Sequence, residues 1–586
     1  MNFQDFYAGL SFDAYTWLGG HLTEEGAVFR TFAPGARQVD LIAECNGWQG
    51  TPMQKVYDGN FWEITVPGAA QGMMYKYKIC GPDERWTDHC DPYGFFAELR
   101  PATASVLYGL PAEAPAPPCR DWAHEAVNIY EIHAGSWQKP GEPGAFYTFR
   151  ELAARLVPYL AENHYDLLEL MPLNEHPCDE SWGYQATGFF SPTARYGTPD
   201  DLRFLIDACH RAGIGVILDF VPVHFAVNDY GLFRYDGTAL YEYPHQDVGY
   251  SEWGSCNFIH SRGEVRSFLQ SAACYWLREF GFDGLRLDAV SNLIYWQGRP
   301  ERGENLAALR FLQTMNAGLK ARCPGALLIA EDSSARPGVT APTGQGGLGF
   351  DCKWDLGWMN DTLAYLQSPP EERRRCPDRL TFSMFYFYNE RYLLPLSHDE
   401  VVHGKAAIVQ KMYGDCPAEK FAQARLLYLY MYAHPGKKLN FMGNELGMLR
   451  EWDEKRPLDW QLDGPRAAFA EFFRALQGLY AQTPAFFARD YEGDGFAWLD
   501  RPAPGRAVFA FVRRGGGQEV LVLLNFDDAD LPGCELPLPG RREARLLLDS
   551  ADAQWGGPRP AACWSFADGR LRTDLTHYSG QYFLLQ

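Results

Sequence analysis

Arg286 and Asp288 stand two residues apart within the sequence DGLRLDAV, which covers residues 283–290. In an extended strand, residues i and i+2 point to the same side, so the two charged side chains would lie together. A nearby arginine lowers the pKa of a carboxyl group and keeps it ionised. A rigidly held carboxylate is the group that attacks a sugar in covalent catalysis. A structural ion pair would explain these two residues equally well.

Polar side chains also stand at the ends of other apolar segments. Alone, each has a common structural explanation: a satisfied core aspartate, a surface histidine, a carboxylate at a helix start, or ordinary tyrosine packing. Their joint occurrence after successive strands favours one shared site. These residues are Asp219 and His224 in and after 215–221, Glu331 and Asp332 after 326–330, His398, Asp399 and Glu400 after 392–396, and Tyr184 after 167–173.

Two carboxyl groups in this set could divide the work of acid and base. A second carboxyl near an ionised Asp288, in a partly dry cleft, would have a raised pKa and could act as a general acid. Alternation along the strand puts Glu331 and Asp332 on opposite faces, so only one of them should face the site. Separation of the two carboxyls by about 5 Å would suit a covalent glycosyl intermediate.

The middle of the chain alternates strand-like and helical patterns. A helix is predicted over 199–212, with Thr198 as its N-cap, and another over 264–280. Eight strands alternating with helices predict a (β/α)8 barrel. A doubly wound open sheet is the alternative, but no glycine-rich phosphate loop follows the first strand. The predicted strands are 127–132, 167–173, 215–221, 284–290, 326–330, 350–354, 392–396 and 438–442.

The chain of 586 residues is too long for one hydrophobic core, and its pattern divides it into parts. Residues 1–110 contain short alternating segments separated by turns, which predict a β-sandwich. A proline-rich linker is predicted at 111–125 and the barrel at 126–483. Residues 484–586 alternate again, which predicts a second antiparallel β-sandwich.

Composition excludes several classes of function. The formal charge of −21 disfavours binding to nucleic acids or anionic membranes. The longest apolar run, residues 426–433, is far too short to span a bilayer, and the first residues lack the features of a secretory signal. The 14 cysteines form no CxxC pair. We therefore expect a reduced, cytoplasmic protein without a metal centre.

The polar segments resemble the conserved blocks of the α-amylase superfamily, glycoside hydrolase family 13. The four matching segments are residues 219–224, 284–290, 329–332 and 396–400. The resemblance implies a retaining double displacement in which Asp288 is the nucleophile, Glu331 the acid/base and Asp399 the group that fixes a distorted sugar. It also implies a binding set for the same glucosyl unit: Arg286, His224, His398 and Tyr184, supported by Asp219.

Flanking segments are similar to those of 1,4-α-glucan branching enzymes, and the segments at 33–36 and 46–48 resemble their starch-binding module. This resemblance implies cleavage of an α-1,4 glucan and transfer of the piece to a 6-hydroxyl, with no cofactor. The expected partner is an α-glucan such as amylose, amylopectin or glycogen, and we expect a monomer. The chain departs from the family at Asp332, where a second glutamate is usual. The flanking matches are 128–137, 171–177, 195–201, 346–358, 398–405 and 441–447.

Two alternatives remain at this point. A hydrolase of the same superfamily, such as an amylase or a trehalohydrolase, would share the same catalytic residues. A non-catalytic glucan-binding protein with a degenerate barrel would lack at least one carboxylate, and all three are present.

Overall fold

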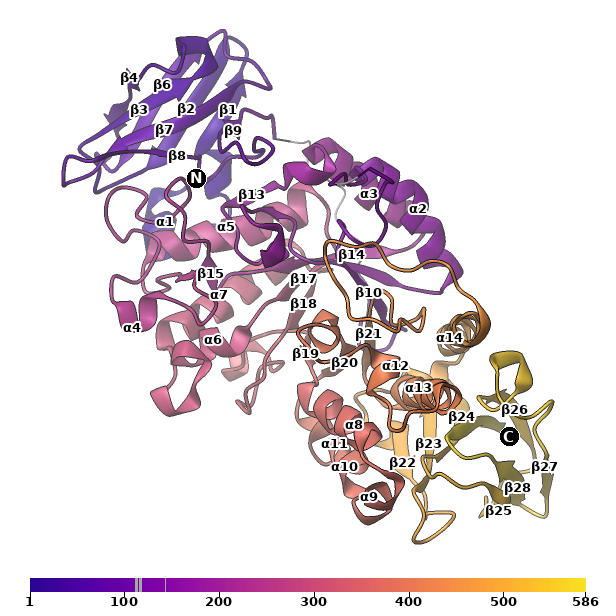
Figure 1. The fold of residues 1–586 in the computed structure, drawn as a ribbon. Coiled ribbons are helices and arrows are strands. Elements are labelled where there is room, and N and C mark those ends of the chain that lie inside the picture. The colour runs from indigo at the N-terminus through magenta and orange to yellow at the C-terminus, as the bar shows by residue number, and fades with distance from the viewer. Residues whose placement is uncertain (111–113, 115–118, 143) are drawn as a thin grey trace.

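A computed structural model describes residues 1–110, 114, 119–142 and 144–586, and its centre is a closed barrel of eight parallel strands (Figure 1). The predicted barrel is confirmed, and each of its strands overlaps the predicted segment. Seven of the fifteen residues in the predicted linker 111–125 lie outside the described residues. The barrel strands are β10 (Asn128–Ile132), β11 (Leu167–Leu170), β14 (Gly215–Phe220), β17 (Gly284–Leu287), β18 (Leu327–Ala330), β19 (Cys352–Trp354), β20 (Tyr392–Leu396) and β21 (Lys437–Phe441).

The inside of the barrel is apolar at one end and charged at the other. Ile129, Leu167, Ile217 and Leu327 belong to one buried cluster near the strand starts. Two residues further along three of these strands stand Glu131, Glu169 and Asp219, which point inward because strand side chains alternate. The carboxyl ends of the strands therefore carry the polar groups.

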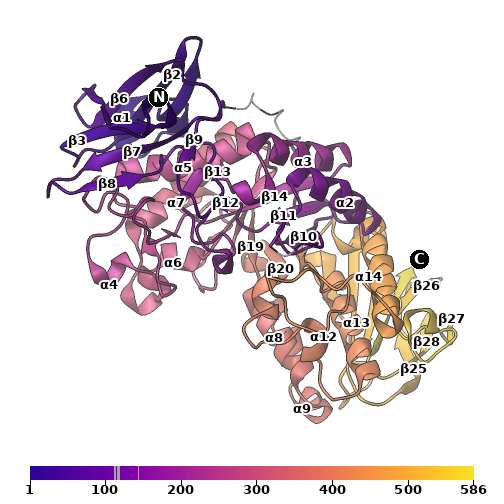
Figure 2. The same ribbon diagram turned by 45° about the horizontal axis from the view of Figure 1, so that its top comes forward.

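Helices surround the barrel (Figures 1 and 2). Thr198 caps α3 by accepting a hydrogen bond from the Asp201 N–H, while the Asp201 carboxylate accepts from the Thr198 N–H at 3.0 Å. Gly213 follows the helix in a left-handed conformation. The predicted helix 199–212 is thus present with one residue fewer. The long helices are α2 (Phe149–Glu162), α3 (Pro199–Arg211), α5 (Gly263–Glu279), α7 (Leu306–Arg322), α8 (Leu356–Gln367), α13 (Pro417–Ala433) and α14 (Gly464–Gln482).

The front of the chain folds into two facing sheets, as predicted, with strand orders β1-β2-β6-β5 and β4-β3-β7-β8. A short helix that the sequence did not predict, α1 (Phe3–Ala8), packs against α5 of the barrel. It lies between the sandwich and the barrel (Figure 1). The strands are β1 (Gly19–Thr23), β2 (Gly26–Phe32), β3 (Gln38–Ala43), β4 (Thr51–Pro52), β5 (Gln54–Val56), β6 (Phe61–Pro67), β7 (Met74–Cys80) and β8 (Trp86–His89).

The end of the chain forms a five-stranded sheet, β22-β23-β24-β29-β26, and a three-stranded sheet, β25-β28-β27. Among the described residues, no helix is long and apolar enough to cross a membrane. The strands are β22 (Phe496–Trp498), β23 (Val508–Gly515), β24 (Gln518–Asn525), β25 (Leu531–Pro537), β26 (Ala544–Asp549), β27 (Trp564–Ala567), β28 (Arg570–Leu575) and β29 (Ser579–Leu585).

A buried ion network joins this last domain to the barrel. Asp490 accepts hydrogen bonds from Lys437 Nζ of β21 at 3.0 Å and from Arg513 Nη2 of β23 at 2.8 Å. Arg513 also donates to the carbonyl oxygen of Ala433 at 2.6 Å. Burial opposes ionisation of Asp490, but the two cations outweigh it and lower its pKa. One carboxylate therefore balances cations from two domains.

Replacement of Asp490 with alanine should destabilise the protein strongly, because Lys437 and Arg513 would remain buried without their counter-charge. We expect the free energy of unfolding to fall by about 3–5 kcal/mol. The measurement is thermal and urea unfolding followed by circular dichroism. Glu84→Ala, which breaks a surface pair with Arg37, is the matched control and should unfold like the wild type. Equal stability of the two variants would contradict the assignment.

Candidate active site

Arg286 joins three carboxylates that come from three neighbouring strands. Its side chain is 1% exposed. Nη1 donates to both oxygens of Asp219, at 2.6 and 2.7 Å, and to Oδ1 of Asp288 at 3.0 Å. Nη2 donates to Oε2 of Glu331 at 2.9 Å. The sheet register places Asp219 directly opposite Arg286, so the barrel itself brings this pair together.

Backbone hydrogen bonds hold the two carboxyl residues that follow β17 and β18. The Asp288 N–H donates to the Phe220 carbonyl at 3.1 Å, which extends the pairing with β14 by one residue. Ala289 has a left-handed backbone with φ of 46°, and its N–H donates to Glu331 Oε2 at 2.9 Å. Such a conformation is strained for alanine and persists where its surroundings enforce it. The turn after Asp288 thus positions the Glu331 carboxyl.

The pKa of Asp288 differs from the sequence-based expectation. Burial and the neighbouring Glu331 raise the pKa of Asp288 well above its usual value, and Arg286 only partly opposes them. The prediction that Arg286 keeps this pKa low is therefore wrong for the ligand-free site, because burial and Glu331 outweigh a guanidinium that also pairs with Asp219 and Glu331.

Glu331 lies close enough to Asp288 to raise the pKa of Asp288. Two carboxyls this close titrate as one unit, because the first negative charge opposes the second. The pair can retain one proton after an isolated carboxyl would have lost it. One ionised and one protonated carboxyl are the two forms that a retaining glycosidic reaction needs.

Asp332 lies on the opposite face of the chain from Glu331. Its side chain is fully buried, and it accepts a hydrogen bond from Lys353 Nζ at 2.8 Å and from the Ser334 N–H at 2.9 Å. Only Glu331 contacts Arg286, as the alternation argument predicted. The departure at Asp332 therefore changes a structural ion pair.

His398 and Asp399 follow β20 and form a second charged group. His398 Nδ1 donates to Glu131 Oε1 at 2.5 Å, and its Nε2 lies 3.5 Å from Asp399 Oδ1. Burial opposes protonation of His398, but the charges of Asp399 and Glu131 raise its pKa to about 9. His398 in turn lowers the pKa of Asp399, whose side chain is 50% exposed. Asp399 is thus an ionised acceptor at the open side of the site.

Tyr184 and His224 complete the predicted set. The Tyr184 hydroxyl donates to Asp219 Oδ2 at 2.5 Å, and its ring stacks on His398 with centroids 5.7 Å apart. His224 lies in β15 (His224–Phe225), and burial lowers its pKa to about 4. Its buried Nδ1 has no partner among the described residues. A neutral histidine with a free ring nitrogen can hydrogen bond a ligand hydroxyl.

The sequence patterns did not identify Glu131 as the partner of His398, although Glu131 lies in the first predicted strand. The signal was present, since a glutamate within an apolar strand is as unusual as Asp219. The patterns also missed the aromatic residues around the charges. Arg286 lies 4.4 Å from the ring centroid of Trp354, and Trp182 contacts both Trp452 and His398.

A cavity of about 230 Å³ opens beside Glu331 and Asp399. Its wall combines apolar side chains with polar groups that could hydrogen bond a sugar. This mixture suits a sugar ring, which has apolar faces and polar edges. The lining residues are Glu331, Trp354, Leu356, Met359, Asn360, Pro395, Ser397, Asp399, Glu400 and Lys405.

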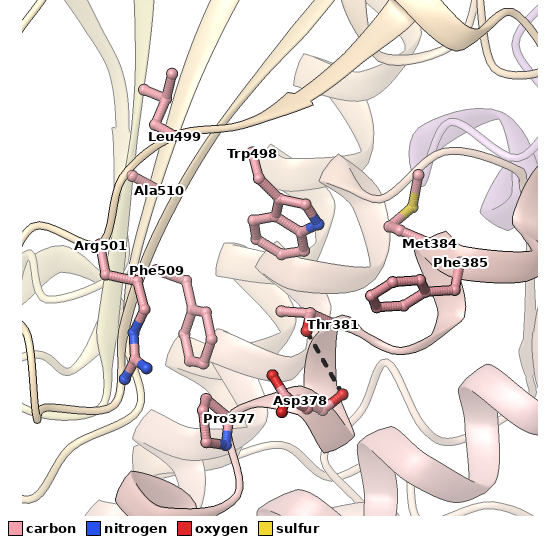
Figure 3. Close-up of a pocket in the computed structure, with 10 residues that line it drawn as sticks. All are labelled: Pro377, Asp378, Thr381, Met384, Phe385, Trp498, Leu499, Arg501, Phe509 and Ala510. Carbon is pink, nitrogen blue, oxygen red and sulfur yellow. Dashed lines mark hydrogen bonds between the residues drawn. The ribbon is translucent and has the colours of Figure 1, made fainter.

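A larger pocket of about 360 Å³ lies elsewhere, between the helices α10 (Asp378–Thr381) and α11 (Ser383–Tyr386) and the sheet of the last domain (Figure 3). The rings of Trp498, Phe385 and Phe509 line it. Asp378 is the single carboxylate in its wall, so it lacks the pair of acids found beside Arg286. The candidate active site is therefore at the carboxyl ends of the barrel strands.

Comparison with known proteins agrees with this architecture. Family models match three parts of the chain: carbohydrate-binding module 48 (isoamylase N-terminal domain) at residues 17–94, the α-amylase catalytic domain at 153–242, and the α-amylase C-terminal all-β domain at 498–569. A protein of Bacillus caldolyticus named 1,4-alpha-glucan branching enzyme GlgB is 43% identical over 571 residues, covering 94% of this chain and 85% of that protein. The protein of the same name from Geobacillus stearothermophilus is 42% identical, with 95% and 90% covered. The chain belongs to the family of 1,4-α-glucan branching enzymes.

Solved structures share the fold of this branching-enzyme family member at much lower identity. A pullulanase from Bacillus acidopullulyticus superimposes with a TM-score of 0.75 at 18% identity, covering 99% of this chain and 76% of that chain. A putative α-amylase from Salmonella typhimurium gives a TM-score of 0.71 at 20% identity, covering 97% and 100%.

Replacement of Glu131 with glutamine should move the alkaline limb of activity to lower pH. Glu131 helps to raise the pKa of His398 from 6.5 to about 9, so the stabilisation that this pair gives is present below 6.5 and is lost as pH rises through 9. Without the carboxylate we expect His398 to lose its proton about one pH unit earlier. The measurement is the pH dependence of kcat/KM. Glu24→Gln, at an exposed position, is the control; an unmoved limb in Glu131→Gln would contradict the role.

Proposed function

We propose that the protein cuts α-1,4-glucan chains and transfers the released piece to a glucosyl 6-hydroxyl, which creates an α-1,6 branch. The observation that carries this proposal is the Arg286-centred group of Asp219, Asp288 and Glu331 in a chain of the branching-enzyme family. The relatives are named for this activity. The three carboxylates expected for it lie at the ends of β17, β18 and β20.

In the first step, protonated Glu331 gives its proton to the glycosidic oxygen as the bond to the anomeric carbon breaks. The ionised Asp288 attacks that carbon, and the donor chain becomes an ester of Asp288. The leaving chain departs with its new hydroxyl. Glu331 is then ionised and hydrogen bonded to the Ala289 N–H and Arg286 Nη2.

In the second step, Glu331 takes the proton from an acceptor 6-hydroxyl, and the alkoxide oxygen attacks the anomeric carbon. The ester bond breaks, Asp288 leaves as a carboxylate, and Glu331 is protonated again. Two inversions at the anomeric carbon give net retention. Arg286 remains beside both carboxyls throughout and compensates whichever one carries the charge.

The surrounding groups would hold the glucosyl unit during these steps. We assign the sugar-fixing role to Asp399, because it is ionised and half exposed. His224, His398 and Tyr184 would contact the same unit, with Asp219 orienting Tyr184 and Arg286. The cavity beside Glu331 would receive the acceptor, since the acid/base acts on the leaving and incoming oxygen.

The front sandwich would bind a further length of the polymer. Its match to carbohydrate-binding module 48 covers most of the two sheets. Trp48 and Trp86 are 42% and 43% exposed, and both rings could stack on sugar faces.

We propose further that the enzyme works as a monomer in the cytoplasm. Thirteen of the 14 cysteines, all except Cys323, form no disulfide in the described structure, which fits a reducing compartment. Light scattering after size exclusion tests the first point, and cell fractionation with an antibody tests the second.

A paired assay on amylose distinguishes transfer from hydrolysis. We expect the iodine colour to fall without new reducing ends, because each cut is followed by a new glycosidic bond. Isoamylase treatment of the product should then release short chains. Reducing ends that rise in step with colour loss would show that water is the acceptor and would overturn the proposal.

Replacement of Asp288 with alanine should abolish turnover, since no ester can form. Glucan binding through the front sandwich should persist, which affinity electrophoresis in glycogen gels can measure. Glu331→Gln should lower kcat by about 10²–10⁴-fold, because the proton donor is lost. Asp415→Ala, an exposed carboxylate, is the control and should retain full activity. Turnover near that of the wild type in Asp288→Ala would refute the nucleophile assignment.

A further inference from the structure

Glu169 is a buried carboxyl group for which the reaction scheme has no use. Glu169 stands within β11 and is 0% exposed. Neither of its carboxyl oxygens has a hydrogen-bond partner among the described residues. The register places it opposite Glu131 of β10 on one side and Ile217 of β14 on the other. An acid in this position is costly unless something satisfies it.

Four charged groups act on Glu169 from the surrounding strands, and they already form two ion pairs. Arg286 is paired with Asp219, and His398 is paired with Glu131. Glu169 therefore lies beside Glu131 and is influenced by both ion pairs, while its own carboxyl oxygens have no partner among the described residues. Burial and then the charge of Glu131 raise the pKa of Glu169 well above its usual value. A neutral acid is the form that this environment favours.

Two buried donors in the same region are also without partners in the described structure. They are Nε of Arg286 and Nε1 of Trp354, whose ring lies 4.4 Å from the Arg286 guanidinium carbon. An unsatisfied buried polar group destabilises the folded state. Buried groups of this kind are normally satisfied by ordered water, which makes about three hydrogen bonds. A neutral carboxyl can both donate to and accept from such water.

We propose that Glu169 is a positioning residue that acts as a neutral acid, hydrogen bonded through ordered water to Arg286 Nε and to the Glu131–His398 pair. This inference rests on the proposed function. Held at Nε, the guanidinium presents Nη1 and Nη2 to Asp288 and Glu331 in a fixed orientation. A neutral partner is needed, because an ionised one would compete with these carboxyls for the charge of Arg286.

Two substitutions separate this role from that of a tolerated core acid. Glu169→Gln keeps the shape and the hydrogen-bonding capacity without a charge. We expect its kcat to stay within about threefold of the wild type, with an unchanged pH profile. Glu169→Leu removes the hydrogen bonds, so we expect kcat to fall by about 10- to 100-fold, with KM nearly unchanged, because the carboxyls lose their alignment.

The readout is total cleavage of glycosidic bonds, counted as transfer plus hydrolysis, so that the result does not depend on which acceptor is used. Tyr275→Phe is the matched control, because it removes the buried hydroxyl of Tyr275 on α5, which also has no partner among the described residues. It should leave kcat unchanged. Wild-type kcat in Glu169→Leu would overturn the positioning role. Equal loss in Glu169→Gln, with the alkaline limb moved to lower pH, would show that the ionised form acts and would overturn the proposal.

A spectroscopic measurement keeps the inference testable if Glu169→Leu does not fold. Infrared spectra of the wild type at neutral pH should contain the carbonyl band of a protonated carboxyl that is missing in Glu169→Gln. Identical spectra in that region would mean that Glu169 is ionised and would contradict the proposal.

Discussion

A single buried guanidinium organises the catalytic end of this barrel. Arg286 would be costly to bury alone, and Asp219, Asp288 and Glu331 would repel one another without it. Each charge is stable there only because the others are present. This mutual dependence explains why the strand register, the strained turn at Ala289 and the hydrogen bond of Tyr184 all meet at one point.

The sharing of Arg286 also decides how the carboxyls titrate. Both oxygens of Asp219 accept hydrogen bonds from Arg286 Nη1. Less of the positive charge of Arg286 therefore remains to balance Asp288 and Glu331. Burial and the neighbouring Glu331 then favour the protonated form of Asp288 in the ligand-free site. On the other side of the site, His398 carries its positive charge because Glu131 and Asp399 lie beside it. The site thus sets its protonation states through shared partners.

The fold supports this chemistry without specifying its outcome. Pullulanase and α-amylase structures share it at under 25% identity, so the barrel alone does not distinguish transfer from hydrolysis. The difference must lie in which acceptor, a sugar or water, reaches the site. In this chain the cavity next to Glu331, with Trp354 and Met359 in its wall, is the part of the structure that would favour a sugar over water.

The amino-acid sequence by itself determined the eight barrel strands, the capped helix after Thr198 and the placement of Glu331 and Asp332 on opposite faces, because hydrophobic period and capping are local properties. It also named the polar residues at the strand ends. Only the tertiary structure decided which of them share a partner. The raised pKa of Asp288 and the influence of two ion pairs on Glu169 depend on distances across the barrel. Such distances follow from how the strands close around one another, and no local pattern in the sequence records them.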